Sequence, residues 1–88
     1  MKISEKKIEK ISEQILALLF SITPKSLFTS HIAQEIARDE EFIKTLLQEL
    51  EKKELVNKIG KNPEGYSYSR RQRWRISNKA YEIYKKHQ

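Results

Sequence analysis

The sequence predicts one small α+β domain that is mainly helical, with three helices, a β-hairpin and a closing helix. The 88 residues are enough for a single hydrophobic core, so we expect residues 1–88 to form one domain. Apolar residues recur at three- and four-residue steps up to about residue 54, which is the period of amphipathic helices. Between residues 66 and 76 the period falls to two, which is the period of a half-buried strand.

The first helix is expected over residues 4–22. Ser4 can cap its start, because a serine hydroxyl accepts a hydrogen bond from a free backbone N–H of the first turn. Thr23-Pro24 should end it, because a residue before proline avoids the helical region. The apolar side chains that share one face of this helix are Ile8, Ile11, Ile15, Leu18, Leu19 and Ile22.

Two further helices joined by a turn are expected over residues 30–54. Thr29 or Ser30 can cap the first of them. A single continuous helix would place Asp39 in the middle of its apolar face, and burying an unpaired carboxylate is costly. Aspartate is also a favoured residue at a helix start. The sequence therefore predicts a break near Arg38-Asp39.

A β-hairpin is expected over residues 55–76. Leu55–Ile59 has the composition of a short strand, and the segment from Gly60 to Gly65 that follows is typical of a turn. In the second strand, Trp74 and Ile76 occupy the even positions and should pack in the core, whereas the arginines occupy odd positions on the opposite face. Ser77 can cap the closing helix, which is expected over residues 77–86.

Positive charge is concentrated in the last third of the chain. Residues 1–54 carry nine Lys/Arg and ten Asp/Glu, a net charge of −1, whereas residues 55–88 carry nine and two, a net charge of +7. A lysine-rich surface that serves only solubility would give a diffuse excess. A localised excess is typical of a protein that binds a polyanion.

Several classes of function are disfavoured by composition. The chain has no cysteine, which excludes disulfides, thiolate zinc sites and thiol nucleophiles. His31 and His87 are isolated, and no Gly-rich phosphate loop or nucleophile motif is present, so we expect no metal, no cofactor and no enzymatic activity. The N-terminus turns polar at once and no apolar run approaches about 20 residues, so a cytoplasmic protein without membrane contact is expected.

Residues 32–56, which run from Ile-Ala-Gln-Glu-Ile to Leu-Leu-Gln-Glu-Leu-Glu-Lys-Lys-Glu-Leu-Val, resemble the helix-turn-helix core of winged-helix transcription regulators. Residues 73–80, Arg-Trp-Arg-Ile-Ser-Asn-Lys-Ala, resemble the strand-to-helix passage that closes the wing in MarR- and PadR-type regulators. The resemblance covers roughly residues 29–84 and implies a winged helix-turn-helix fold. Ala37 and Glu54 stand where these families often have glycine. Glu40 and Glu41 stand where the recognition helix usually carries Ser, Thr or Arg.

The resemblance also implies that the helix over residues 40–54 enters the major groove of DNA. Its solvent-facing candidates are Glu41, Lys44, Thr45 and Gln48, of which Gln48 could pair with adenine and Lys44 with guanine or phosphate. The alternative is that the charged residues only stabilise the helix, through the pairs Glu40–Lys44 and Glu49–Lys53 and through acids near its positive end.

Arginines dominate the hairpin, and guanidinium groups bind phosphate oxygens in pairs. The predicted contacts with the DNA backbone are Arg70, Arg71, Arg73 and Arg75, broadened by Lys58 and Lys61. The alternative is a solvated strand face, but four arginines within six residues, with no acid among them, disfavour it.

The expected function is sequence- or shape-selective binding of duplex DNA, as a transcription regulator. Two alternatives stay open: an RNA-binding, ribosome-associated winged helix, and a protein-interaction module that uses Glu40, Glu41, Glu49 and Glu51. Regulators of this shape commonly dimerise, so a homodimer through the first and last helices is a further expectation, although a monomer stays open. The apolar residues that could join its interface are Ile3, Leu16, Phe20, Tyr81 and Tyr84.

Overall fold

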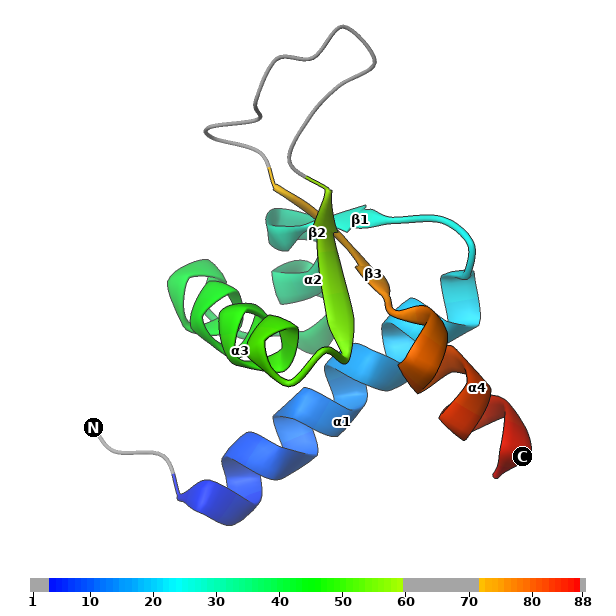
Figure 1. Cartoon of the computed structure of the whole chain (residues 1–88). Coiled ribbons are helices and arrows are strands. Elements are labelled where there is room, and N and C mark those ends of the chain that lie inside the picture. Colours follow the sequence, from blue (N-terminus) through cyan, green and yellow to red (C-terminus); the bar gives the residue numbers. More distant parts are fainter. Residues whose placement is uncertain (1–3, 60–71, 88) are drawn as a thin grey trace, which may run out of the picture.

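The computed structural model describes residues 4–59 and 72–87. Within them the chain forms four helices and a small antiparallel sheet, which confirms the predicted mainly helical α+β class (Figure 1). The elements in order are α1 (Glu5–Ile22), β1 (Leu27–Phe28), α2 (Thr29–Ile36), α3 (Glu40–Lys52), β2 (Val56–Ile59), β3 (Arg73–Ile76) and α4 (Asn78–Lys86). No helix in these two segments is both long and apolar enough to span a bilayer.

Helix α1 begins and ends where the sequence predicts. The Lys7 N–H donates to Ser4 Oγ at 3.3 Å, and the helix ends before Thr23, whose peptide bond to Pro24 is cis. Its inner face joins α2, α3, β3 and α4 into one core (Figure 1). Leu16, expected as a residue free for a subunit interface, is only 7% exposed and belongs to this core. It is buried because its side of α1 also packs against α3.

The predicted break between α2 and α3 is confirmed. Ala37 adopts the left-handed conformation, with φ 59° and ψ 47°, and the backbone N–H of Arg38 then reaches the Ala33 carbonyl at 3.0 Å. Asp39 caps α3, because its carboxylate accepts from the Phe42 N–H at 3.1 Å. This pattern of bonds around a left-handed residue is the Schellman motif, which satisfies the last carbonyls of a helix.

Helix α3 ends in the same way, two residues earlier than predicted. Glu54 has φ 63°, its N–H donates to the Glu51 carbonyl, and the Leu55 N–H donates to the Leu50 carbonyl, both at 2.9 Å. The last turn therefore closes at Lys52, and the chain reverses directly into β2.

The prediction that Thr29 or Ser30 caps α2 is wrong. The helix begins at Thr29, and the preceding Phe28 makes no side-chain cap. The Thr29 hydroxyl is used elsewhere, because it accepts a hydrogen bond from the indole Nε1 of Trp74 at 2.8 Å.

The expected hairpin is part of a three-stranded sheet with the order β1-β3-β2. Strand β3 pairs antiparallel with both neighbours, so that Trp74 lies opposite Leu27 on one side and Lys58 on the other. Strand β1 was not predicted, because two residues are too few to show a period. Trp74 and Ile76 are buried against the helices, as predicted. Ser77 caps α4 by accepting from the Ala80 N–H at 3.1 Å.

Candidate nucleic-acid interface

The outer face of α3 carries the first group of predicted contact residues. Glu41, Thr45 and Gln48 are exposed, whereas Lys44, expected to face solvent, is half-buried. The Thr45 hydroxyl donates to the carbonyl of Glu41, one turn earlier, at 3.0 Å. Because its proton is used within the helix, Thr45 offers a ligand only a methyl group and acceptor lone pairs. Gln48 keeps both its amide donor and its acceptor available to solvent.

The charges on α3 do not form the predicted ion pairs. Glu49 lies 3.5 Å from Lys52, three residues on, instead of pairing with Lys53. Within the described residues no ion pair joins Glu40 to Lys44. Exposed pairs of this kind contribute less than about 1 kcal/mol, so ion pairing adds little to the stability of α3. Glu40 and Glu41 lie in the first turn, where negative charge complements the helix dipole, so this part of the stabilising alternative holds.

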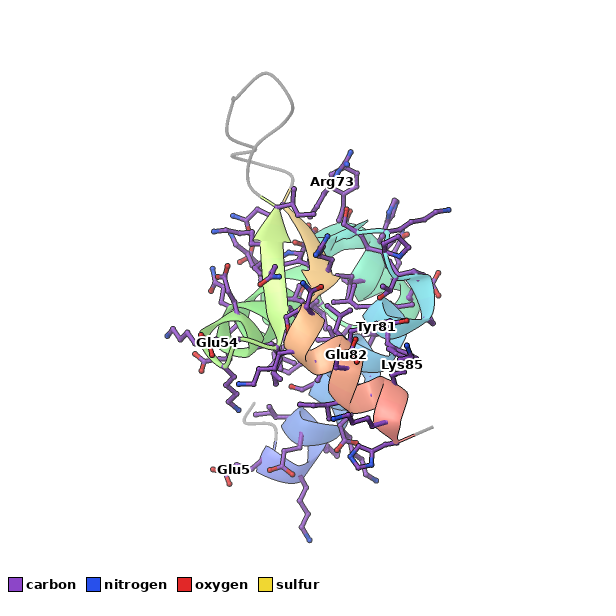
Figure 2. The ribbon with its side chains drawn as sticks, turned by 45° about the vertical axis from the view of Figure 1, so that its right-hand side comes forward. Glu5, Glu54, Arg73, Tyr81, Glu82 and Lys85 are labelled. Atoms are coloured by element: carbon purple, nitrogen blue, oxygen red, sulfur yellow. The ribbon has the colours of Figure 1, made fainter. Side chains whose placement is uncertain are left out.

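The second group of predicted residues lies on the sheet. Lys58 is exposed on β2, and Arg73 and Arg75 are half-buried on β3, on the face opposite to Trp74 and Ile76. Figure 2 shows Arg73 at the end of the molecule opposite to Glu5, which begins α1. Three more predicted contacts, Lys61, Arg70 and Arg71, lie outside the described residues.

Arg73 is held by an aromatic side chain that sequence reasoning missed. Its guanidinium carbon lies 4.7 Å from the ring centroid of Phe28, which is its partner across the sheet. The ring of Phe28 also meets the ring of His31 edge-on, with the centroids 5.8 Å apart. A guanidinium stacked on a ring face keeps its N–H groups in its own plane, where they can donate hydrogen bonds. In Arg73 the Nε is buried, so the terminal amino groups are the ones that a ligand can reach. The two residues of β1 are too few to show a pattern, so the sequence gives no signal of this stack.

Arg75 lies in a different environment, near α4. It lines a cleft of about 240 Å³ together with the residues Thr23, Pro24, Ile76, Asn78, Tyr81 and Glu82. Figure 2 labels two of these lining residues, Tyr81 and Glu82, which lie on α4. Within the described residues Arg75 forms no ion pair with a carboxylate.

The described surface therefore offers two different chemistries. The helix α3 presents an amide, a methyl group and carboxylates, which can discriminate between ligands but contribute little attraction to a polyanion. The strands β2 and β3 present cations, which attract phosphate without reading sequence. In the two described segments no three His, Cys, Asp or Glu side chains come together as a metal site would require.

Comparisons with known proteins bear on the fold. A scan against models of protein families finds no match to the chain, and a search of curated protein sequences finds none either. Solved structures do match. The complex of Staphylococcus aureus MepR with DNA superposes with a TM-score of 0.72 at 18% sequence identity, covering 94% of this chain and 68% of that one.

Two further structures agree with this comparison. A second structure of MepR gives a TM-score of 0.69 at 18% identity, covering 93% of this chain and 60% of that one. It describes MepR as a transcription regulator of the S. aureus multidrug efflux pump MepA. PcaV, a transcriptional regulator from Streptomyces coelicolor solved with its natural ligand, gives 0.65 at 14% identity, covering 94% and 51%. The chain thus spans between about half and two thirds of these longer proteins. Together with the order of helices and strands, they show that this chain has the winged helix-turn-helix fold.

Proposed function

We propose that the protein binds duplex DNA in the cytoplasm as a transcription regulator, and that its role is binding, not catalysis. The observation that carries the proposal is the placement of charge on the fold. The net charge of +7 over residues 55–88 falls on the wing (β2, β3 and the residues between them) and on α4. The wing is the part of a winged helix that lies beside DNA when the recognition helix enters the major groove. MepR, which has the same fold, has been solved in complex with DNA.

In this proposal α3 reads bases. Gln48 is exposed and can make the bidentate pair that amide side chains make with adenine. Thr45 can contact a thymine methyl group through its own methyl, since its hydroxyl proton is already used. Glu41 can accept from the amino group of cytosine, and Lys44 can extend from its half-buried position toward guanine or phosphate.

The wing contributes most of the attraction. Lys58, Arg73 and Arg75 bind phosphates, as do the residues Lys61, Arg70 and Arg71. These contacts release counterions, so affinity should fall steeply as salt is added. The acidic first turn of α3 repels phosphates and so opposes this attraction at the helix. The wing arginines therefore contribute the larger share of the binding free energy.

Titration of the protein with duplex DNA, single-stranded DNA and structured RNA at several salt concentrations tests the proposal. For duplex DNA the logarithm of the affinity should fall with the logarithm of salt by about 0.9 for each phosphate neutralised. Replacing Arg71 and Arg73 by Ala should flatten this slope by nearly two units. The matched control replaces Lys6 and Lys7, two exposed lysines at the start of α1, and removes the same charge.

The control should leave the slope near the wild-type value, because these lysines lie at the end of the molecule opposite to Arg73. Equal flattening by both double variants would mean that only net charge matters, and the wing assignment would be lost. Tighter binding to structured RNA than to duplex DNA would favour the ribosome-associated alternative.

We further propose a homodimer through α1 and α4. Phe20 on α1 contacts two tyrosines of α4, with ring centroids 5.2 Å from Tyr81 and 5.6 Å from Tyr84, and all three rings stay partly exposed. Beside them Ile83 is 46% exposed, which makes it the large hydrophobic side chain that stands out among the described residues. Sedimentation should show a dimer that Ile83→Glu dissociates; a monomer at high concentration would contradict this.

A further inference from the structure

The start of α2 is joined to the start of β3 by three hydrogen bonds, all of which involve Thr29. Its backbone N–H donates to the carbonyl of Gln72 at 3.1 Å, and its hydroxyl donates to the same carbonyl at 3.4 Å. The oxygen of that hydroxyl accepts from the indole Nε1 of Trp74 at 2.8 Å. Gln72 and Trp74 flank Arg73, so both sides of this arginine along the chain are held by one threonine.

The junction is buried, so only a residue with a hydroxyl group can satisfy its hydrogen bonds. Thr29 is 6% exposed and Trp74 0% exposed, so water cannot replace a bond that is lost. The Thr29 hydroxyl acts as donor and acceptor at once, which valine, although of the same shape, cannot do. A valine here would leave the indole N–H of Trp74 without a partner inside the core.

This junction connects the two parts of the proposed DNA-binding surface. Helix α2 packs against α3, which carries the recognition residues, and β3 is the second strand of the wing. Phe28 strengthens the connection on the outside, since its ring lies under the guanidinium of Arg73. Figure 1 shows β1, the start of α2 and the sheet meeting at the base of the wing.

We propose that Thr29 is a positioning residue, which fixes the angle of the wing relative to α3 so that both reach one duplex together. The inference rests on the proposed function and goes beyond it, because Thr29 itself is buried and does not touch DNA. Holding two contact surfaces in their bound arrangement removes the cost of ordering them on binding. Without the junction α3 can still enter the groove, but the wing arginines no longer meet phosphates at the same time.

The experiment compares Thr29→Val and Thr29→Ser with a control, Ser21→Ala. Ser21 also has a hydroxyl that donates a hydrogen bond to a backbone carbonyl, that of Leu18 at 2.7 Å, but it lies on the exposed side of α1. Duplex affinity is measured against salt for each folded protein. Trp74, the single tryptophan of the chain, reports the state of the junction through its fluorescence emission.

Thr29→Val should flatten the salt slope by about one to two units, the equivalent of one or two lost phosphate contacts. Its Trp74 emission should also differ from that of the wild type. Thr29→Ser, which keeps the hydroxyl, should restore both values, and Ser21→Ala should change neither. Arg73→Ala should flatten the slope by about 0.9 in the wild-type background and by clearly less when Thr29 is already valine.

A wild-type salt slope in a folded Thr29→Val protein would overturn the inference while leaving the proposed function intact. So would full additivity of the Thr29 and Arg73 substitutions. Absence of salt-dependent duplex binding by the wild-type protein would overturn both. If Thr29→Val does not fold, Phe28→Leu is the substitute, because it removes the outer contact on Arg73 without opening the core. This variant should flatten the salt slope by up to about one unit. An unchanged slope would again contradict the positioning role.

Discussion

Replacing Ala37 by glycine should stabilise the protein. Ala37 is exposed and holds the left-handed conformation that ends α2, at φ 59° and ψ 47°. An L-residue in this region costs about 1–2 kcal/mol, because its Cβ crowds the following carbonyl. Glycine avoids that clash but loses about 0.5–1 kcal/mol more backbone entropy on folding. The free energy of unfolding should therefore rise by about 0.5–1 kcal/mol, which corresponds to a Tm increase of about 2–8 °C.

The matched control is Ala17→Gly, at an exposed position within α1. It introduces the same residue into right-handed helix, so it should lower the free energy of unfolding by about 0.5–1 kcal/mol. The entropy of glycine in the unfolded chain is common to both variants, and the difference between them isolates the left-handed penalty. Urea and thermal unfolding followed by circular dichroism measure both. Destabilisation by both substitutions to the same extent would refute the reasoning.

Three further predictions concern the ends of the helices and one partly buried tyrosine. Glu54→Gly should raise the free energy of unfolding by about 0.5–1 kcal/mol for the same reason as at Ala37, less a small loss from its exposed ion pair; a fall on urea unfolding would contradict this. Ser77→Ala should lower the free energy of unfolding by about 1–3 kcal/mol, because the Ser77 hydroxyl caps α4 and donates to the Glu54 carbonyl at 2.8 Å. The control Ser21→Ala, on the exposed side of α1, should change the free energy of unfolding by less than about 0.5 kcal/mol. Burial, and to a lesser extent Glu13, raise the pKa of Tyr84 above 10.0, so the stability that this group contributes is present below pH 10 and is lost as the pH rises beyond it. Unfolding titrations should show a smaller alkaline loss for Tyr84→Phe, and an identical loss would count against the burial of this hydroxyl.

The parts of the fold that local chemistry decides could be predicted from the sequence. Ser4, Asp39 and Ser77 each cap the helix that the sequence assigns to them, because capping depends on a side chain and the backbone two or three residues away. The even-numbered Trp74 and Ile76 are buried as the alternation of the strand predicts.

The parts that depend on distant partners could not be predicted. Thr29 has the composition of a cap, but its hydroxyl bonds to Trp74, which lies 45 positions along the chain. Strand β1 exists only because β3 offers it an edge. Ala37 and Glu54 adopt the conformation that glycine would favour, because the Schellman bonds and the adjoining elements outweigh a penalty of about 1–2 kcal/mol at each.

The candidate site follows the same division. Alternation along β3 correctly places Arg73 and Arg75 on the face opposite to the core, but it cannot show that one stacks on Phe28 and the other lines a cleft beside α4. Helical periodicity places Gln48 and Thr45 on the exposed face of α3, but the hydrogen bond that uses the Thr45 proton depends on its rotamer.

In the proposed function, α3 and the wing form one surface for duplex DNA. Titration of labelled protein with a short duplex, followed residue by residue through amide chemical shifts in NMR spectra, tests it most directly. We expect the largest changes on the outer face of α3, around Gln48, and on the strands around Lys58 and Arg73. The start of α1 near Lys6 should stay unchanged. Changes confined to α1 and α4, with α3 and the wing strands unaffected, would contradict it.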